Sequence, residues 1–455
     1  MSTSIRLQEL DWVDPVRAFW AVRHHEGVAF LDSALRGHTA SRWTYLALDP
    51  AETIEIRRDA TVLRRRGESS WQVEPDWREA LRRRLPAASP GAPRNIPPFA
   101  GGWIGWLGYE LAPEFDRIPV RAEPLPGTPL ASFAFYDTLD AFDLMERRRW
   151  RVSFGDGGID LPETEGARAT PAPLPAPAGW VTDCLPPERF MAAVEEAKER
   201  IRAGEIYQVN LSRQFRLDPA PDPASTLIRL RENSPAPYAA FLSSSAGTLV
   251  SSSPELFLEY DPIARRAVSR PIKGTRPRGT SHAEDVLLAR ELASSPKDRA
   301  ENVMIVDLIR HDLGRVCQTG SVRVSELCRT EIHPTVFHLV STVEGILRPG
   351  LDALDALDAL FPGGSITGAP KIRSCHVIRE LEPVPRGPYT GALGYLSVTG
   401  HCALAMAIRV VWFCGGTAVF SAGGGIVADS DPEAELRETE VKAAAMKRAL
   451  GISDA

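Results

Sequence analysis

Three short glycine-rich segments follow one another between residues 387 and 427, and no helical pattern separates them. They read GPYTGALGYLSV, CALAMAIRVVWF and TAVFSAGGGIV. Short runs of β-branched and aromatic residues, ended by glycine or another turn-forming residue, are typical of consecutive strands. The predicted helices fall in blocks of their own. Because strands are grouped apart from helices, we predict an α+β protein with antiparallel β-sheets.

Helices are predicted where apolar residues recur every three or four positions. In residues 186–204 the apolar side chains share one face, and Gly204 follows as a stop signal. That face consists of Phe190, Val194, Ala197 and Ile201. Further helices are predicted over residues 282–295, 298–316, 351–361 and 431–450. The leucines that recur every third residue in 351–361 indicate a packed stripe, which is a structural feature.

The clearest change of composition is the proline–alanine run TPAPLPAPAG at residues 170–179. Such a run forms a stiff, extended connector. It predicts an N-terminal strand-rich domain of residues 1–160, a proline-rich linker of residues 161–180 and a larger domain of residues 181–455.

The overall composition excludes several classes of function. The net charge is -6, whereas a nucleic-acid binder usually carries a basic patch, so no nucleic-acid partner is expected. No apolar run approaches ~20 residues, so no membrane partner is expected. The six cysteines show no C-x-x-C and no zinc spacing, and no signal-peptide pattern precedes them. These features predict a cytoplasmic protein with reduced thiols.

Two pairs of acidic residues suggest a site for a hard cation. Asp298 and Glu301 lie three positions apart on one predicted helix, and Glu435 and Glu438 repeat that spacing on another, with Lys442 one turn further on. Either pair alone is typical of a solvated helix face. If both pairs converge, their carboxylates suit Mg²⁺, which prefers a few protein oxygens together with substrate oxygens.

Other residues suggest a pocket for an anion. Arg409 interrupts an apolar strand, and a buried arginine needs a protein or substrate carboxylate. The glycine triplet in SAGGGIVADSDPEAE predicts a turn whose N–H groups approach an anion, and a tight strand-to-helix connection fits equally well. Tyr389 either donates to a ligand or fills the core. Lys273, in SRPIKGTRPRG, is either a solvated turn residue or a reactive amine.

Taken in order, the motifs after residue 185 resemble the chorismate-utilising enzymes. The motifs are GEIYQVNLSRQF, SSSPELF, RPIKGTRPRG, DRAENVMIVDLIRHDLGRV, VFHLVSTVEG, FPGGSITGAPKIRS, GPYTGALGY, AIRVV and AGGGIVADSDPEAELRETEVKA. Within that family the chain looks most like the aminodeoxychorismate synthases, whose sister group is the anthranilate synthases. The resemblance implies a large fold in which antiparallel sheets pack face to face, with helices on the outside.

The resemblance also implies a substrate, chorismate, and a cofactor, Mg²⁺. By motif matching, Glu301 and Glu438 would be direct metal ligands, and Asp298 and Glu435 would act through waters. The other implied substrate-binding residues are Gly274, Thr275, Ser365, Tyr389, Arg409, Gly423, Gly425 and Lys442. His338 would orient the reacting ring.

For catalysis, the resemblance implies an acid and a nucleophile. Glu255 matches the residue that protonates the leaving hydroxyl. Lys273 stands where the anthranilate synthases have alanine and the aminodeoxychorismate synthases have a nucleophilic lysine. Arg270 and Arg276 are candidates for the positive charge that keeps this amine neutral. Gln208 stands where water-using relatives have a lysine, which disfavours water as the nucleophile.

No part of the chain resembles a glutamine amidotransferase, so the resemblance implies a separate amidotransferase subunit that supplies ammonia. Ser33 and Pro237 match a region where relatives hold tryptophan. Two alternatives stay open: anthranilate synthesis, and a non-catalytic scaffold for an amidotransferase.

Overall fold

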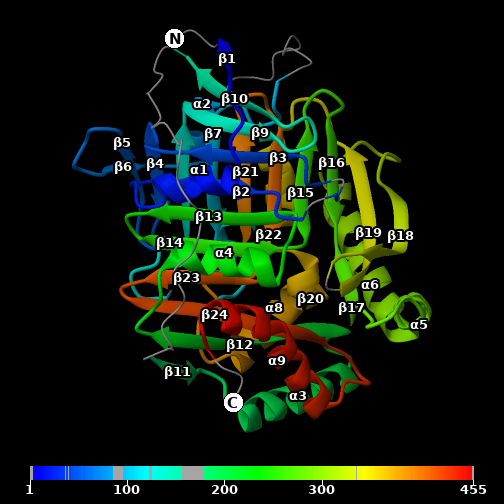
Figure 1. The fold of residues 1–455 in the computed structure, drawn as a ribbon. Helices are drawn as coiled ribbons and strands as arrows, with labels where there is room; N and C mark the ends of the chain where they lie inside the picture. The colour runs from blue at the N-terminus through cyan, green and yellow to red at the C-terminus, as the bar shows by residue number, and fades with distance from the viewer. Residues whose placement is uncertain are drawn as a thin grey trace.

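The computed structural model describes residues 4–35, 37–38, 40–85, 96–121, 125–155, 179–334 and 336–452. Within these ranges, two β-sheets of twelve strands each form the framework, and their strand pairings are antiparallel (Figure 1).

The first sheet has the order β1 (Ile5–Leu10), β10 (Arg148–Phe154), β9 (Thr138–Asp143), β3 (Trp43–Ala47), β2 (Ala29–Asp32), β13 (Tyr238–Ser244), β14 (Gly247–Ser253), β23 (Val410–Cys414), β24 (Thr417–Ile426), β12 (Gln208–Asp218) and β11 (Trp180–Asp183), and β20 (Gly368–Ala369) pairs with β12. The second sheet has the order β17 (Ile272–Pro277), β19 (Val336–Ile346), β16 (Arg266–Arg270), β15 (Leu256–Asp261), β22 (Cys402–Met406), β21 (Ala392–Ser397), β7 (Gly102–Leu107), β8 (Ala131–Tyr136), β4 (Glu52–Ile56), β5 (Thr61–Arg65) and β6 (Gln72–Glu74), and β18 (Arg323–Ile332) pairs with β19.

Both sheets combine strands from the two sides of the predicted linker. In the first sheet β2 pairs with β13, and in the second β7 pairs with β21. Residues 161–178 of the predicted linker lie outside the described ranges. The division at this linker remains a prediction from composition, whereas the β framework is built jointly by both parts of the chain.

The two sheets pack against each other through a shared aromatic core. Tyr45 and Trp412 of the first sheet join Trp106 and Tyr395 of the second in one buried cluster. The rings of Trp106 and Trp412 lie 5.2 Å apart between centroids, and those of Tyr45 and Tyr395 lie 5.8 Å apart. This contact confirms the predicted α+β fold with sheets packed face to face.

Helices cover the outer faces of the two sheets (Figure 1). They are α1 (Pro15–Val22), α2 (Trp77–Arg84), α3 (Pro187–Arg202), α4 (Pro223–Asn233), α5 (His282–Ser294), α6 (Pro296–Gly314), α7 (Ala353–Leu360), α8 (Lys371–Leu381) and α9 (Pro432–Ala449), with the 3-10 turns η1 (Tyr109–Glu114) and η2 (Gly364–Ile366). Phe19 of α1, Leu227 of α4 and Met446 of α9 share one core with strands of the first sheet.

Capping residues explain where the predicted helices begin. Helix α6 starts two residues before the predicted position. The Ser295 side chain caps the helix by accepting a hydrogen bond from the N–H of Asp298, and Pro296 occupies the first turn. In α7, Asp352 and Asp355 form a capping box, which leaves Leu351 outside the predicted stripe. The six cysteines are unpaired, as predicted. In the described ranges, the helices lack the length and apolarity needed to cross a membrane.

Candidate active site

A lysine and a glutamate meet at one serine in the interior. Lys273 extends from β17 and donates from Nζ to the carbonyl of Ser365 at 3.0 Å. The Ser365 hydroxyl donates to Oε1 of Glu255 at 2.6 Å. All three side chains are buried. The 3-10 turn η2 therefore joins the predicted nucleophile to the predicted acid.

Burial shifts the pKa values of both ionisable groups in the direction that favours their neutral forms. Burial lowers the pKa of Lys273, and the charge of Lys442 lowers it further, while Glu301 and Glu255 oppose the shift. Burial raises the pKa of Glu255 to about 7. Among the described residues, Lys273 forms no ion pair with a carboxylate. The carboxylates near the amine therefore act on it without a direct ion pair.

The arginines beside Lys273 do not supply the charge that the sequence suggested. Arg270 pairs with Glu331. Arg276 pairs with Glu291 at 2.7 Å and with Asp298 at 3.1 Å. Neither arginine is among the main groups that shift the pKa of Lys273, and the positive charge that lowers it is that of Lys442, so the charge expected of the two arginines comes from Lys442.

The two residues after Lys273 connect it to other elements. Gly274 has φ +82°, and a Cβ there would lie 2.9 Å from the side chain of Asp298, so only glycine fits. Thr275 Oγ1 lies 3.0 Å from Nδ1 of His338 on β19. Burial lowers the pKa of His338 well below its ordinary value. Its Nε2 is buried and has no hydrogen-bond partner in the described structure.

The glycine triplet 423–425 lies inside strand β24, so the predicted turn is wrong at this position. Extended glycines leave room for acidic side chains from two helices. A Cβ at Gly424 would lie 3.1 Å from Glu438 and 3.2 Å from Glu435, and one at Gly425 would lie 3.4 Å from Glu301. The structure therefore brings three of the four predicted carboxylates to one stretch of backbone.

The acidic group fits a divalent cation. Oε2 of Glu435 is buried and lacks a hydrogen-bond partner among the described residues, and buried acceptors of this kind require compensation. Neighbouring lysines balance part of the charge: Lys442 lies 2.6 Å from Glu438 and Lys297 lies 3.3 Å from Glu435. The oxygens of the three carboxylates, Glu301, Glu435 and Glu438, are suitable ligands for Mg²⁺. A groove of about 1080 Å³ opens beside Glu301.

Three of the predicted substrate-binding residues, Arg409, Lys442 and Tyr389, differ in what they contact. Arg409 has φ +50° and donates to the Ser234 hydroxyl at 3.2 Å, and within the described ranges it pairs with no carboxylate. Burial lowers its pKa. Lys442 of α9 donates to the carbonyl of Gly423 at 2.9 Å. Tyr389 is buried in the core between the sheets. Arg409 therefore has capacity for a ligand carboxylate.

The two residues of the predicted tryptophan region lie at the same end of one strand pair. Ser33 follows β2 and Pro237 precedes β13, and these strands pair with Asp32 opposite Ala239. The Ser33 hydroxyl donates to the carbonyl of Trp43 at 2.7 Å. Both residues are buried or nearly so.

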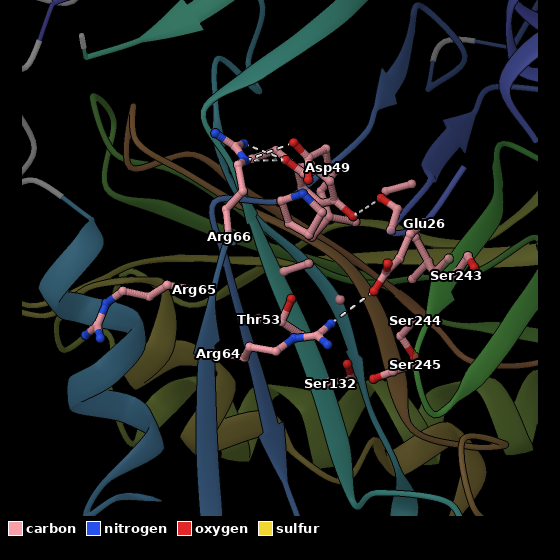
Figure 2. A pocket seen from close by; sticks show the side chains of 18 of the residues that line it. Glu26, Asp49, Thr53, Arg64, Arg65, Arg66, Ser132, Ser243, Ser244 and Ser245 are labelled. Carbon is pink, nitrogen blue, oxygen red and sulfur yellow. Dashed lines mark hydrogen bonds and ion pairs between the residues drawn. The ribbon is translucent and has the colours of Figure 1, made fainter. Parts of the chain in front are cut away.

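A separate cavity of about 340 Å³ lies at the opposite end of β2 and β13 (Figure 2). Arg64 points into it and pairs with Glu26 at 3.1 Å. Thr53 and Ser132 also line the cavity. None of the predicted site residues lines this cavity, which is therefore separate from the candidate active site.

A buried ionic network near the site was missed by the sequence reasoning. Arg386 pairs with Glu382 at 2.7 Å and donates to the carbonyl of Ile366, next to Ser365. Glu110 accepts the N–H groups of residues 386 and 387, each at 2.8 Å. The network ties the η2 turn to the segment before Tyr389. Its signal in the sequence is charge within apolar context, as in GYELAP and PVPRGPYTG.

Comparison with known proteins identifies the family. The model of the family described as chorismate binding enzyme matches residues 30–448. The chain belongs to this family of chorismate-binding enzymes, and the predicted membership is confirmed.

Its relatives carry more than one name. Aminodeoxychorismate synthase component 1 of Bacillus subtilis is 35% identical over 445 residues, which are 95% of this chain and 93% of the relative. Anthranilate synthase component 1 of Streptomyces coelicolor is 41% identical over 400 residues, 83% of this chain and 78% of the relative. The crystal structure of anthranilate synthase component I from Streptococcus pneumoniae matches with a TM-score of 0.75 and 31% identity, covering 90% of this chain and 92% of that one.

Proposed function

We propose that this chain is the chorismate-converting subunit of an aminodeoxychorismate synthase. It would form 4-amino-4-deoxychorismate from chorismate and ammonia, a precursor of para-aminobenzoate and folate. The observation that carries the proposal is Lys273, which is buried, unpaired with any carboxylate among the described residues, and linked to Glu255 through Ser365. A surface lysine would have none of these properties.

The reaction consists of two displacements that balance. Nζ of Lys273 forms a bond to ring carbon 2 while the ring double bond shifts and the carbon 4 hydroxyl leaves. Glu255 protonates that hydroxyl, which departs as water. Ammonia then bonds to carbon 4, the double bond shifts back, and lysine leaves carbon 2 as a neutral amine from its ammonium adduct. One proton of the new ammonium group returns to Glu255. His338 and Thr275 would orient the ring. The net change replaces hydroxyl by amine at one carbon.

In this proposal Glu301 and Glu438 would hold Mg²⁺ directly, and Glu435 would support it. Bound Mg²⁺ would supply positive charge for the ring carboxylate of the substrate. Asp298 is paired with Arg276. We therefore propose that its carboxylate packs beside Gly274 and is not a ligand of Mg²⁺. Tyr389, Arg409 and the backbone at Gly425 would hold the enolpyruvyl carboxylate.

The ammonia would come from a separate glutamine amidotransferase subunit, because the names of the relatives designate a component 1. Gln208 is buried and lies against Gly425. A glutamine amide cannot act as the base that activates water, which favours an amine over water as the nucleophile. Anthranilate synthesis is the second candidate, since relatives with that name match equally broadly.

Product analysis tests the function. With chorismate, Mg²⁺ and an ammonium salt, the purified chain is expected to form 4-amino-4-deoxychorismate without pyruvate. Removing Mg²⁺ with a chelator should abolish turnover, and adding Mg²⁺ back should restore it. Chromatography resolves the products, and a coupled lactate dehydrogenase assay detects pyruvate. Formation of anthranilate together with pyruvate would establish the second candidate instead.

Replacing Arg409 by glutamine tests the proposed carboxylate contact. Loss of one partner of a buried charge pair typically removes 2–5 kcal/mol of binding, so we expect KM for chorismate to rise by about 10²-fold. The thermal midpoint should not fall, because an uncompensated buried charge is removed. Arg409→Lys keeps the positive charge but lacks the planar guanidinium group. Its KM for chorismate should lie between those of the unmodified chain and Arg409→Gln. A lowered midpoint with unchanged KM would contradict this assignment.

A further inference from the structure

Two histidines and a glutamate from distant parts of the chain meet beside the candidate active site. His38 lies between β2 and β3, Glu331 lies on β18, and His333 follows β18. Oε2 of Glu331 lies 3.5 Å from Nε2 of His38 and 3.8 Å from Nε2 of His333. One donor atom from each residue falls within 4.8 Å of the others. The sequence separation makes this arrangement a product of the fold.

The donor atoms of this cluster are oriented but incompletely used. His333 is 5% exposed, and its Nε2 has no hydrogen-bond partner in the described part of the chain. Arg270 pairs with Oε1 of Glu331 and leaves Oε2 facing both rings. A second partner that fixes a carboxylate is a common feature of metal sites. The side chains of His38 and Glu331 are partly exposed, which gives solvent access.

We propose that His38, Glu331 and His333 form a binding site for a divalent transition-metal ion such as Zn²⁺. Two imidazoles and one carboxylate are the ligand set of several zinc and iron sites, and they leave coordination positions for water. Mg²⁺ prefers oxygen ligands alone, so the ion bound here differs from the one held by Glu301 and Glu438.

Metal binding at this site would alter the hydrogen bond between the N–H of Ala40 and the ring of His38. The N–H of Ala40 donates to Nδ1 of His38 at 3.1 Å, which places the proton of the neutral ring on Nε2. Ligation through Nε2 moves that proton to Nδ1 and releases Ala40. Metal binding through Nε2 is therefore expected to break the hydrogen bond between Ala40 and His38.

The site also borders the proposed reaction centre. The rings of His333 and His338 lie 4.9 Å apart between centroids, and His338 contacts Thr275. A bound ion that fixes His333 would thus affect the position of His338. The metal site itself does not depend on the proposed function, because its residues are separate from Lys273, Glu255 and the acidic group.

Cobalt provides the probe, since Co²⁺ bound by nitrogen and oxygen ligands absorbs visible light. The full chain, stripped of metals with a chelator, is titrated with Co²⁺ in excess Mg²⁺, which occupies the oxygen site. We expect one equivalent of Co²⁺ to give a visible absorption band. Added Zn²⁺ should displace the Co²⁺ and remove the band. The variants His38→Ala and Glu331→Gln should weaken Co²⁺ binding by more than the roughly 10- to 100-fold typical for loss of a supporting residue.

Two control variants, His282→Gln and His311→Gln, replace exposed histidines elsewhere and should leave the band unchanged. Circular dichroism verifies that each variant is folded. His38 is partly exposed, so His38→Ala decides the question even if Glu331→Gln fails to fold. Absence of a band in the unmodified chain, or the same band in folded His38→Ala, would overturn the site. Product formation is not used as a readout, so failure of the proposed function would leave this result unaffected.

Discussion

Replacing Lys273 by alanine is expected to lower the formation of 4-amino-4-deoxychorismate by about 10³-fold or more, because the nucleophile is removed. The same change should abolish a covalent adduct. When the unmodified chain is incubated with chorismate and Mg²⁺ but no ammonia, the first displacement can occur and the second cannot. Intact mass spectrometry should then show the protein plus chorismate less one water.

The control for this experiment is Lys198→Ala, which changes a lysine on α3 that pairs only with Glu195 among the described residues. This variant should form the adduct and turn over like the unmodified chain. An adduct that persists in Lys273→Ala would place the covalent bond on another residue. Full activity in Lys273→Ala would refute the lysine mechanism, even if product analysis still identified the enzyme as an aminodeoxychorismate synthase.

Replacing Glu255 by glutamine is expected to lower kcat by about 10²- to 10⁴-fold, the range for loss of a general acid. The amide has nearly the shape of the carboxyl group, but it cannot transfer a proton. Binding of chorismate, measured by calorimetry in the absence of ammonia, should change little. An unchanged kcat would show that another group protonates the leaving hydroxyl.

The pH dependence follows from the pKa of Glu255, which burial raises from 4.5 to about 7. The acid form is the active one, so kcat/KM should fall as the pH rises through about 7. The fall should vanish in Glu255→Gln. Lys273 must be neutral, which gives the opposite trend, because the rate rises with pH as the amine loses its proton. Because the Ser365 hydroxyl lowers the pKa of Glu255, Ser365→Ala should move the falling limb to higher pH.

The same shift affects stability. The folded protein holds the proton of Glu255 up to about pH 7, whereas the unfolded chain releases it near 4.5. The folded state therefore binds more protons between these values, and the free energy of unfolding falls as the pH rises across this window, by about 3 kcal/mol in total. Glu255→Gln should remove this part of the pH dependence, as measured by urea unfolding at several pH values.

Local patterns predicted the elements well because they depend on neighbouring residues. The apolar spacing in residues 186–204 corresponds to α3, and the runs around Tyr45 and Ile54 correspond to β3 and β4. Predictions failed where conformation depends on distant partners. The sequence of the glycine triplet predicts a turn, but residues 418–426 of β24 are held extended by pairing with β12.

The sequence alone determined the family and predicted most helices and strands, and it singled out Lys273 and Glu255 as candidate catalytic residues, because these inferences depend on residue type and order. Only the tertiary structure decided whether Lys273 is buried and which neighbouring groups shift its pKa. Lys273 and Ser365 are 92 positions apart, and Glu255 and Ser365 are 110 apart. Contacts across such separations arise from the packing of sheets and helices, and desolvation by that packing sets the pKa values on which the chemistry depends.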